Sequence, residues 1–79
     1  MEQESIRKLE QVFRSVFSLS EDANVSHLTR NSEVPWDSLN FVTLIAAIES
    51  EFDCSFDAGD ALKLDSYQAA RSLLEQRGF

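Results

Sequence analysis

One serine, Ser38, stands between an acidic residue and a long apolar run in the segment WDSLNFVTLIAAIESEF, 36–52. A serine hydroxyl can act as a nucleophile, or it can be the point at which another group is attached to the chain. If a helix begins at Ser38, an anionic group attached there would meet free backbone N–H groups and the positive end of the helix dipole. Asp37 and Ser38 are also residue types that cap helices, so capping alone could explain them.

A catalytic use of Ser38 lacks suitable partners. His27 is the only histidine of the chain. Asp37 and Ser38 are adjacent and cannot easily flank one imidazole in the order that a catalytic triad requires. The nucleophile-elbow motif is also missing. The sequence therefore disfavours an independent hydrolase.

The sequence offers no specific metal or nucleotide site. The stretch DCSFDAGDALKL, 53–64, has oxygen ligands at alternate positions, but its glycine comes one residue too late for a calcium loop and Leu64 stands where glutamate is needed. One histidine and the single cysteine, Cys54, cannot form a closed zinc site. Gly59 and Gly78 are the only glycines, which leaves no phosphate-binding loop. We predict neither a metal site nor nucleotide hydrolysis.

Size and charge narrow the class of protein. Seventy-nine residues predict one domain, 1–79, with a modest core. The 14 acidic and 7 basic residues leave a formal net charge of -7, which opposes binding to nucleic acid or to an anionic membrane. The lone cysteine, the polar N-terminus without a signal-peptide region and the lack of a long apolar stretch predict a cytoplasmic protein that is not in a membrane. We expect a monomer with protein partners.

Apolar residues recur with helical spacing in several segments of the chain. The spacing predicts a first helix over 5–17 with Ser5 as N-cap, and a second over 38–52 that Asp37 caps. A short helix weakened by Gly59 is expected within 57–63, and a last helix over 66–76 that ends near Gly78. No strand pattern competes, so the predicted fold is all-α, a small four-helix bundle of three main helices and one short helix.

A long loop joins the first two helices. Residues 19–35 are rich in polar residues, with Val25, Leu28 and Val34 as apolar anchors in the latter part of the stretch. Pro35 disfavours a helical conformation at Val34. Connections of this length in compact domains are usually functional or held by side-chain packing.

The second helix has two apolar faces. On a helical wheel one stripe is the expected core face, and it contains Phe41, Leu44, Ile45, Ile48 and Phe52. The opposite side carries Leu39, Val42 and Ala46, where a solvated helix would be polar. Exposed apolar residues are common singly, but a strip flanked by polar groups is a candidate contact surface.

The segments WDSLNFVTLIAAIESEFD, 36–53, then Phe56, and KLDSYQAARSLLE, 63–75, together resemble an acyl carrier protein of the phosphopantetheine-dependent carrier superfamily. The likeness extends more loosely over the first helix and the long loop. It implies that Ser38 is modified by a phosphopantetheinyl transferase, which uses coenzyme A to leave a 4′-phosphopantetheine arm on the serine oxygen. It further implies that the arm holds acyl groups as thioesters and that the chain is a carrier, not an enzyme.

The resemblance also implies where partner enzymes bind. In this family the second helix is the main recognition element, and acidic residues on it meet basic patches of the transferase and of acyl-loading and acyl-processing enzymes. Asp37, Glu49 and Glu51 match acidic positions of that kind. The other expected partner-binding residues are Trp36, Leu39, Val42, Thr43 and Ala46.

This sequence departs from the fatty-acid type of carrier. That type tends to have Gly-Ala before D-S-L and more acidic residues after it, where Pro35, Trp36, Asn40 and Thr43 stand here. The W-D-S-L form resembles discrete carriers of specialised pathways, such as polyketide, peptide-hybrid or modified-sugar biosynthesis. Trp36 could shield the arm or touch a partner, but we favour packing of its indole over the loop and the bundle.

In some members of this family the acyl chain enters the bundle between its helices. The candidates for such a cleft are Ile45, Ile48, Phe56, Leu62 and Leu64, although ordinary core packing is the simpler role for each. Two alternatives remain for the whole chain. One is a peptidyl carrier protein with an aminoacyl group on the same arm, and the other is a non-catalytic helical adaptor in which Ser38 only caps the helix.

Overall fold

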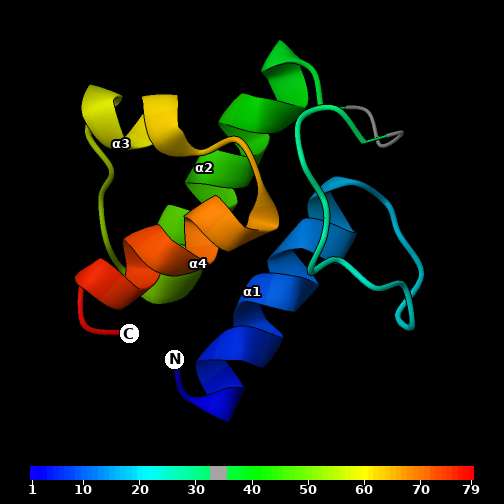
Figure 1. The fold of residues 1–79 in the computed structure, drawn as a ribbon, viewed down its shortest axis with the longest axis horizontal. Helices are drawn as coiled ribbons and strands as arrows, with labels where there is room; N and C mark the ends of the chain where they lie inside the picture. Colours follow the sequence, from blue (N-terminus) through cyan, green and yellow to red (C-terminus); the bar gives the residue numbers. More distant parts are fainter. Residues whose placement is uncertain (33–35) are drawn as a thin grey trace.

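The computed structural model describes residues 1–32 and 36–79, and its regular elements within these ranges are four α-helices. The helices are α1 (Gln3–Val16), α2 (Ser38–Phe52), α3 (Ala58–Lys63) and α4 (Tyr67–Gln76). α1 packs against both α2 and α4 (Figure 1). The two termini lie near each other at the end opposite the start of α2. The expected small helical bundle is confirmed.

Three of the four helices begin with a side-chain cap. Asp37, Asp57 and Ser66 each precede a helix, and the side-chain oxygen of each accepts a backbone N–H bond of 2.8 to 3.0 Å. These bonds satisfy N–H groups that have no partner within the helix. The predicted start of α2 is confirmed to the residue.

The predicted N-cap of the first helix is wrong. α1 begins at Gln3, and Ser5 lies inside its first turn. The Ile6 N–H donates to the Glu2 oxygen at 3.0 Å, so the helical bonding starts before Ser5, and Glu2 occupies the cap position without a side-chain bond. An acidic residue in the first turn, Glu4, favours this longer helix because it faces the positive end of the dipole.

The core fills the space between α1, α2, α4 and the long loop. The apolar stripes predicted for the helices supply most of it. Its buried members are Leu9, Val12, Phe13, Phe17, Val25, Leu28, Leu44, Ile48, Phe52, Leu64, Tyr67, Ala70, Leu73 and Leu74. Because a short helix such as α4 is marginal in isolation, the burial of its apolar residues in this core is what stabilises it.

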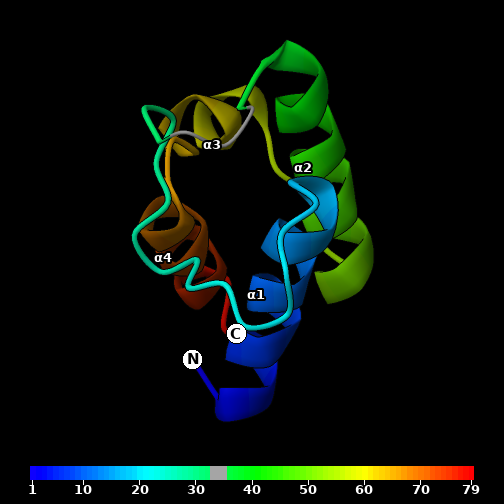
Figure 2. The ribbon, with the colours of Figure 1, turned by 90° about the vertical axis from the view of Figure 1, so that its right-hand side faces the viewer.

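The long loop is tied to the start of α4. The Tyr67 N–H donates to the Leu28 oxygen at 3.0 Å, and the Arg30 N–H donates to the Asp65 oxygen at 2.9 Å. Thr29 and Ser66 form an isolated antiparallel bridge beside these bonds. Residues 19–32 of the loop thus have a defined course although they are not helical, as Figure 2 shows.

Side-chain packing also holds the loop. The expected anchors Val25 and Leu28 are buried in the core, while the expectations for Val34 and Pro35 lie outside the described residues. Arg14 of α1 donates from its Nε and Nη2 atoms to the Ala23 oxygen, at 3.0 and 2.9 Å. The loop is therefore connected to α1 as well as to α4.

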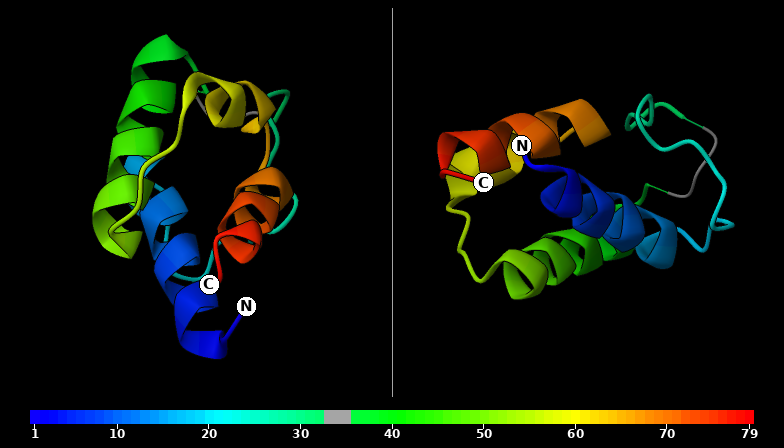
Figure 3. Two further views of the ribbon diagram at one scale, coloured as in Figure 1. Left: turned by 90° about the vertical axis from the view of Figure 1, so that its left-hand side faces the viewer. Right: turned by 90° about the horizontal axis from the view of Figure 1, so that it is seen from below.

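α3 differs from the other helices because none of its residues is buried. It lies at the end of the bundle where α2 begins, between α2 and α4 (Figures 2 and 3). A side chain at the C-terminal end of α4 contacts α3 and the segment before it. The Arg77 guanidinium pairs with the Asp60 carboxylate and lies 5.1 Å from the centre of the Phe56 ring.

Replacing Tyr67 with phenylalanine is expected to leave the free energy of unfolding unchanged or to raise it by up to about 1 kcal/mol. The Tyr67 side chain is buried against Phe13, and its hydroxyl has no hydrogen-bond partner among the described residues. Burial of this hydroxyl also raises its pKa. Phenylalanine keeps the ring contact and removes the unpaired group. Urea unfolding followed by circular dichroism tests this, and a loss above about 1 kcal/mol would contradict it.

Across the ranges that the structure covers, no helix combines the length and the apolar character needed to cross a membrane.

Candidate functional site

Ser38 is the first residue of α2, and its side chain is exposed. The cap of this helix belongs to Asp37, whose Oδ1 atom accepts the Asn40 N–H at 2.8 Å. Within the described residues, the Ser38 hydroxyl takes part in no hydrogen bond, although it stands at the helix start. Capping therefore accounts for Asp37 but leaves the Ser38 hydroxyl accessible for chemistry.

The second apolar face of α2 is exposed, as the helical wheel predicted. Leu39 and Val42 expose 75% and 63% of their surface, and Ala46 is exposed one turn further on. Thr43 is exposed beside them, and its Oγ1 atom donates to the Leu39 oxygen at 2.9 Å. The strip of Leu39, Val42 and Ala46 begins next to Ser38, so a protein that reaches the serine can touch the strip.

The acidic residues expected on this helix have different surroundings. Asp37 is exposed beside Ser38, and Glu51 is exposed near the other end of α2. Glu49 is half-buried, and its Oε2 atom accepts the Phe56 N–H at 2.7 Å. Glu49 therefore fixes the connection from α2 to α3, a structural task that the sequence did not indicate.

Trp36 packs as the simpler interpretation predicted. Its indole is half-buried, stacks on Phe17 with ring centres 5.2 Å apart, and lies 6.0 Å from the ring centre of Phe13. Its Nε1 atom is buried and has no hydrogen-bond partner among the described residues. The indole thus joins the segment just before Ser38 to the aromatic core of α1.

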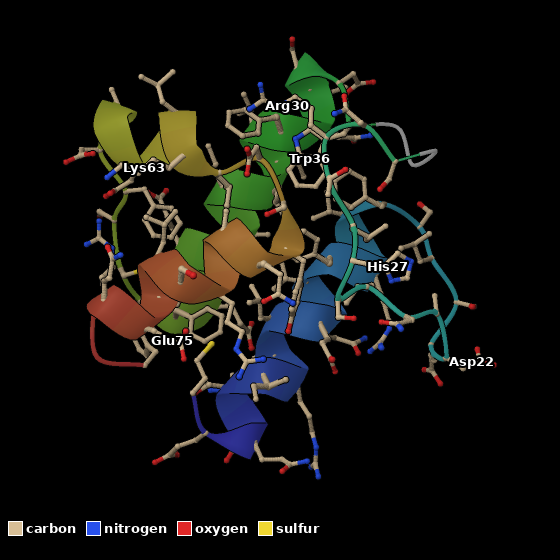
Figure 4. All side chains as sticks on the ribbon, viewed as in Figure 1. Asp22, His27, Arg30, Trp36, Lys63 and Glu75 are labelled. Atoms are coloured by element: carbon tan, nitrogen blue, oxygen red, sulfur yellow. The ribbon has the colours of Figure 1, made fainter. Side chains whose placement is uncertain are left out.

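A pocket of about 530 Å³ opens beside Ser38, between the long loop, the start of α2 and α3. Figure 4 shows Arg30 and Trp36 near one another at this end of the molecule. The residues that line the pocket are Arg30, Trp36, Asp37, Ser38, Phe41, Ala58, Ala61 and Leu62. Among the described residues most of its wall is apolar, with one cation, Arg30, and one carboxylate, Asp37.

The five residues expected to form an acyl cleft do not share this pocket. Leu62 lines it and exposes 83% of its surface. Ile48 and Leu64 are fully buried in the core, and Ile45 and Phe56 are half-buried against it. Their role in a cleft stays a prediction.

Sequence reasoning missed Arg30 and Phe41 as neighbours of Ser38. Phe41 follows Ser38 by three residues, which is the spacing of one helical turn, so its place could have been inferred. Arg30 lies eight residues earlier in a loop, and no periodicity relates it to Ser38. Its position depends on the backbone bond that joins the loop to Asp65.

The other reactive side chains lie away from Ser38 or are poorly reactive. Figure 4 shows His27 on the long loop, well separated from Trp36 and the start of α2. Burial raises the pKa of the Cys54 thiol, so little thiolate forms at neutral pH. In the part of the chain that is described, no three His, Cys, Asp or Glu residues gather to hold a metal ion.

The curated proteins to which this chain is similar are named acyl carrier proteins. The chain is 31% identical over 72 residues to acyl carrier protein 2, chloroplastic, of Spinacia oleracea, an alignment that covers 91% of this chain and 55% of the relative. It is 28% identical over 76 residues to acyl carrier protein 5, chloroplastic, of Arabidopsis thaliana, covering 96% of this chain and 55% of the relative. An acyl carrier protein, chloroplastic, of Brassica napus is 29% identical over 73 residues, with 92% and 54% covered.

The chain spans about half the length of the curated relatives that it matches. No family model and no solved structure matches it.

Proposed function

We propose that this chain, a homologue of the acyl carrier proteins, carries acyl groups as thioesters on a 4′-phosphopantetheine arm attached to Ser38. The observation that carries the proposal is the exposed Ser38 hydroxyl at the first position of α2, in a helix that Asp37 already caps. The relatives named acyl carrier proteins support the same role. In this proposal the chain is a carrier that enzymes modify and use, and it is not itself an enzyme.

The residues around Ser38 suit an attached phosphodiester. When Ser38 is modified, its Oγ atom forms a bond to the phosphorus that bears pantetheine in coenzyme A, and the bond from that phosphorus to adenosine 3′,5′-bisphosphate breaks. The transferase takes the serine proton. The N-terminal end of α2, where the helix dipole is positive, then favours the new anion. The arm supplies a terminal thiol that holds the acyl group as a thioester.

The partners proposed for this chain are a phosphopantetheinyl transferase and enzymes that load and process acyl groups. Asp37, Leu39 and Val42 are exposed around Ser38 and can meet such a protein directly. The W-D-S-L segment favours a specialised pathway over general fatty-acid synthesis. A monomeric state and a cytoplasmic location stay predictions.

The mass of the intact protein tests the proposal. We expect incubation with coenzyme A and a broad-specificity transferase to add one phosphopantetheine group, and fragmentation of the product to locate it on Ser38. Acyl-coenzyme A substrates in place of coenzyme A should add the acylated arm. No mass gain with several active transferases would contradict the proposal and favour the helical adaptor.

Replacing Leu39 with alanine is expected to lower kcat/KM of the transferase for this chain by roughly tenfold or more, because central apolar contacts often contribute over 1 kcal/mol to a protein interface. Leu39 is largely exposed in this structure, so the change should hardly affect stability. Steady-state kinetics of mass gain provides the measurement.

Phe79→Ala is the control for Leu39→Ala, because Phe79 is another exposed apolar side chain and lies at the C-terminus, at the end of the molecule opposite the start of α2 (Figure 1). We expect it to have a smaller effect on kcat/KM. Equal losses in the two variants would show that the strip on α2 is not the main contact.

A further inference from the structure

The pocket beside Ser38 contains one positively charged side chain, Arg30. The guanidinium is exposed and forms no ion pair with any described residue. Its backbone is held in place, because the Arg30 N–H donates to the Asp65 oxygen at 2.9 Å. The backbone of Arg30 is thus anchored, and its side chain lines the same pocket as Ser38.

We propose that Arg30 is a positioning residue that binds the phosphodiester of the arm on Ser38. The first part of the arm would then lie along the pocket against Trp36 and Leu62 instead of extending into solvent. This inference rests on the proposed function, since it needs an arm on Ser38.

The chemistry of the pocket supports this pairing. A phosphodiester on Ser38 is held by its covalent bond at the pocket edge, and a guanidinium offers N–H donors whose geometry fits phosphate oxygens. Asp37 also lines the pocket, but its carboxylate forms no ion pair with Arg30 in this structure. The net charge of -7 repels an added phosphate, and a nearby guanidinium offsets part of this repulsion.

The apolar wall suits the part of the arm next to the phosphate. That part carries two methyl groups on one carbon, and Trp36, Phe41 and Leu62 present apolar surface beside Ser38. A carboxylate on the cargo is a less suitable partner for Arg30, because it would lie at the far end of a long arm.

Nuclear magnetic resonance of the arginine side chains tests the proposal. The apo protein is labelled with ¹⁵N, converted fully to the holo form and checked by mass. We expect the Arg30 Nε–H resonance to shift on conversion and to move back towards its apo position at high salt, which screens the pair. We also expect the fluorescence of Trp36, the only tryptophan, to change on conversion.

Variants separate the phosphate contact from a general structural role. In the Arg30→Gln variant, the change in Trp36 fluorescence on conversion to the holo form should be lost or reduced. The Arg30→Lys variant should keep part of this fluorescence change, because lysine retains the positive charge. Arg7→Gln is the matched control, because it removes an exposed arginine from the first turns of α1, at the other end of the molecule (Figure 1). It should leave the Trp36 change intact.

The following results would contradict a contact between Arg30 and the phosphodiester. An unshifted Arg30 resonance in fully converted protein, or an undiminished Trp36 change in Arg30→Gln, would overturn it and leave the carrier function in place. A shift that appears only after loading with a carboxylate-bearing acyl group would assign Arg30 to the cargo instead. Failure of the wild-type chain to gain the arm would overturn the carrier proposal and this one with it.

Discussion

Ser38→Ala is expected to abolish the gain of phosphopantetheine completely while the helical fold persists. The substitution removes the only atom to which the arm can be attached in this proposal. The Ser38 side chain is exposed and is not the cap of α2, so its loss should change the free energy of unfolding by less than about 0.5 kcal/mol. Intact mass and urea unfolding measure the two effects.

Two control variants make the Ser38→Ala result specific. Ser50→Ala removes another exposed serine of α2 and should leave the mass gain unchanged. Asp37→Ala removes the capping carboxylate and should cost about 1 kcal/mol of stability. The arm should still be added to Ser38, but more slowly, because Asp37 is also proposed to contact the transferase. Modification of Ser38→Ala at another residue would refute the assignment of Ser38.

Phe13→Ala is expected to lower the free energy of unfolding by about 3–5 kcal/mol. Phe13 is 0% exposed, and its ring lies against those of Phe17, Trp36 and Tyr67. Because domains are stable by only about 5–15 kcal/mol, such a loss would leave much of this small chain unfolded or close to unfolding. Phe17, Trp36 and Tyr67 would also lose the ring that all three contact.

Urea unfolding of wild type and Phe13→Ala gives this difference, and Phe79→Ala is the matched control. Phe79 is 36% exposed and contacts only one ring, that of Phe52, among the described aromatic residues. Its truncation should therefore cost much less than that of Phe13. A similar loss in both variants would show that the aromatic cluster around Phe13 is not the centre of the core.

The helices could be predicted because their signals are local. The caps Asp37, Asp57 and Ser66 and the apolar spacing between them mark three helix starts within a few residues. The start of α1 was missed because Ser5 is a good cap by residue type, whereas the actual start uses a backbone carbonyl and no side-chain bond. Residue type alone cannot distinguish these two ways of beginning a helix.

Local sequence signals are enough to predict that Ser38 opens an amphipathic helix and that Leu39, Val42 and Ala46 face away from the core. Both follow from the period of an α-helix and from the cap that Asp37 provides, and neither depends on distant residues.

The surroundings of Ser38, in contrast, depend on contacts between residues that are distant in the sequence. The tertiary structure brought Arg30 to the serine through the backbone bond to Asp65, stacked Trp36 on Phe17, and engaged Glu49 with the Phe56 N–H. These contacts join residues with no helical relation to one another. They arise because the loop and the helices must share one core and satisfy their backbone hydrogen bonds together.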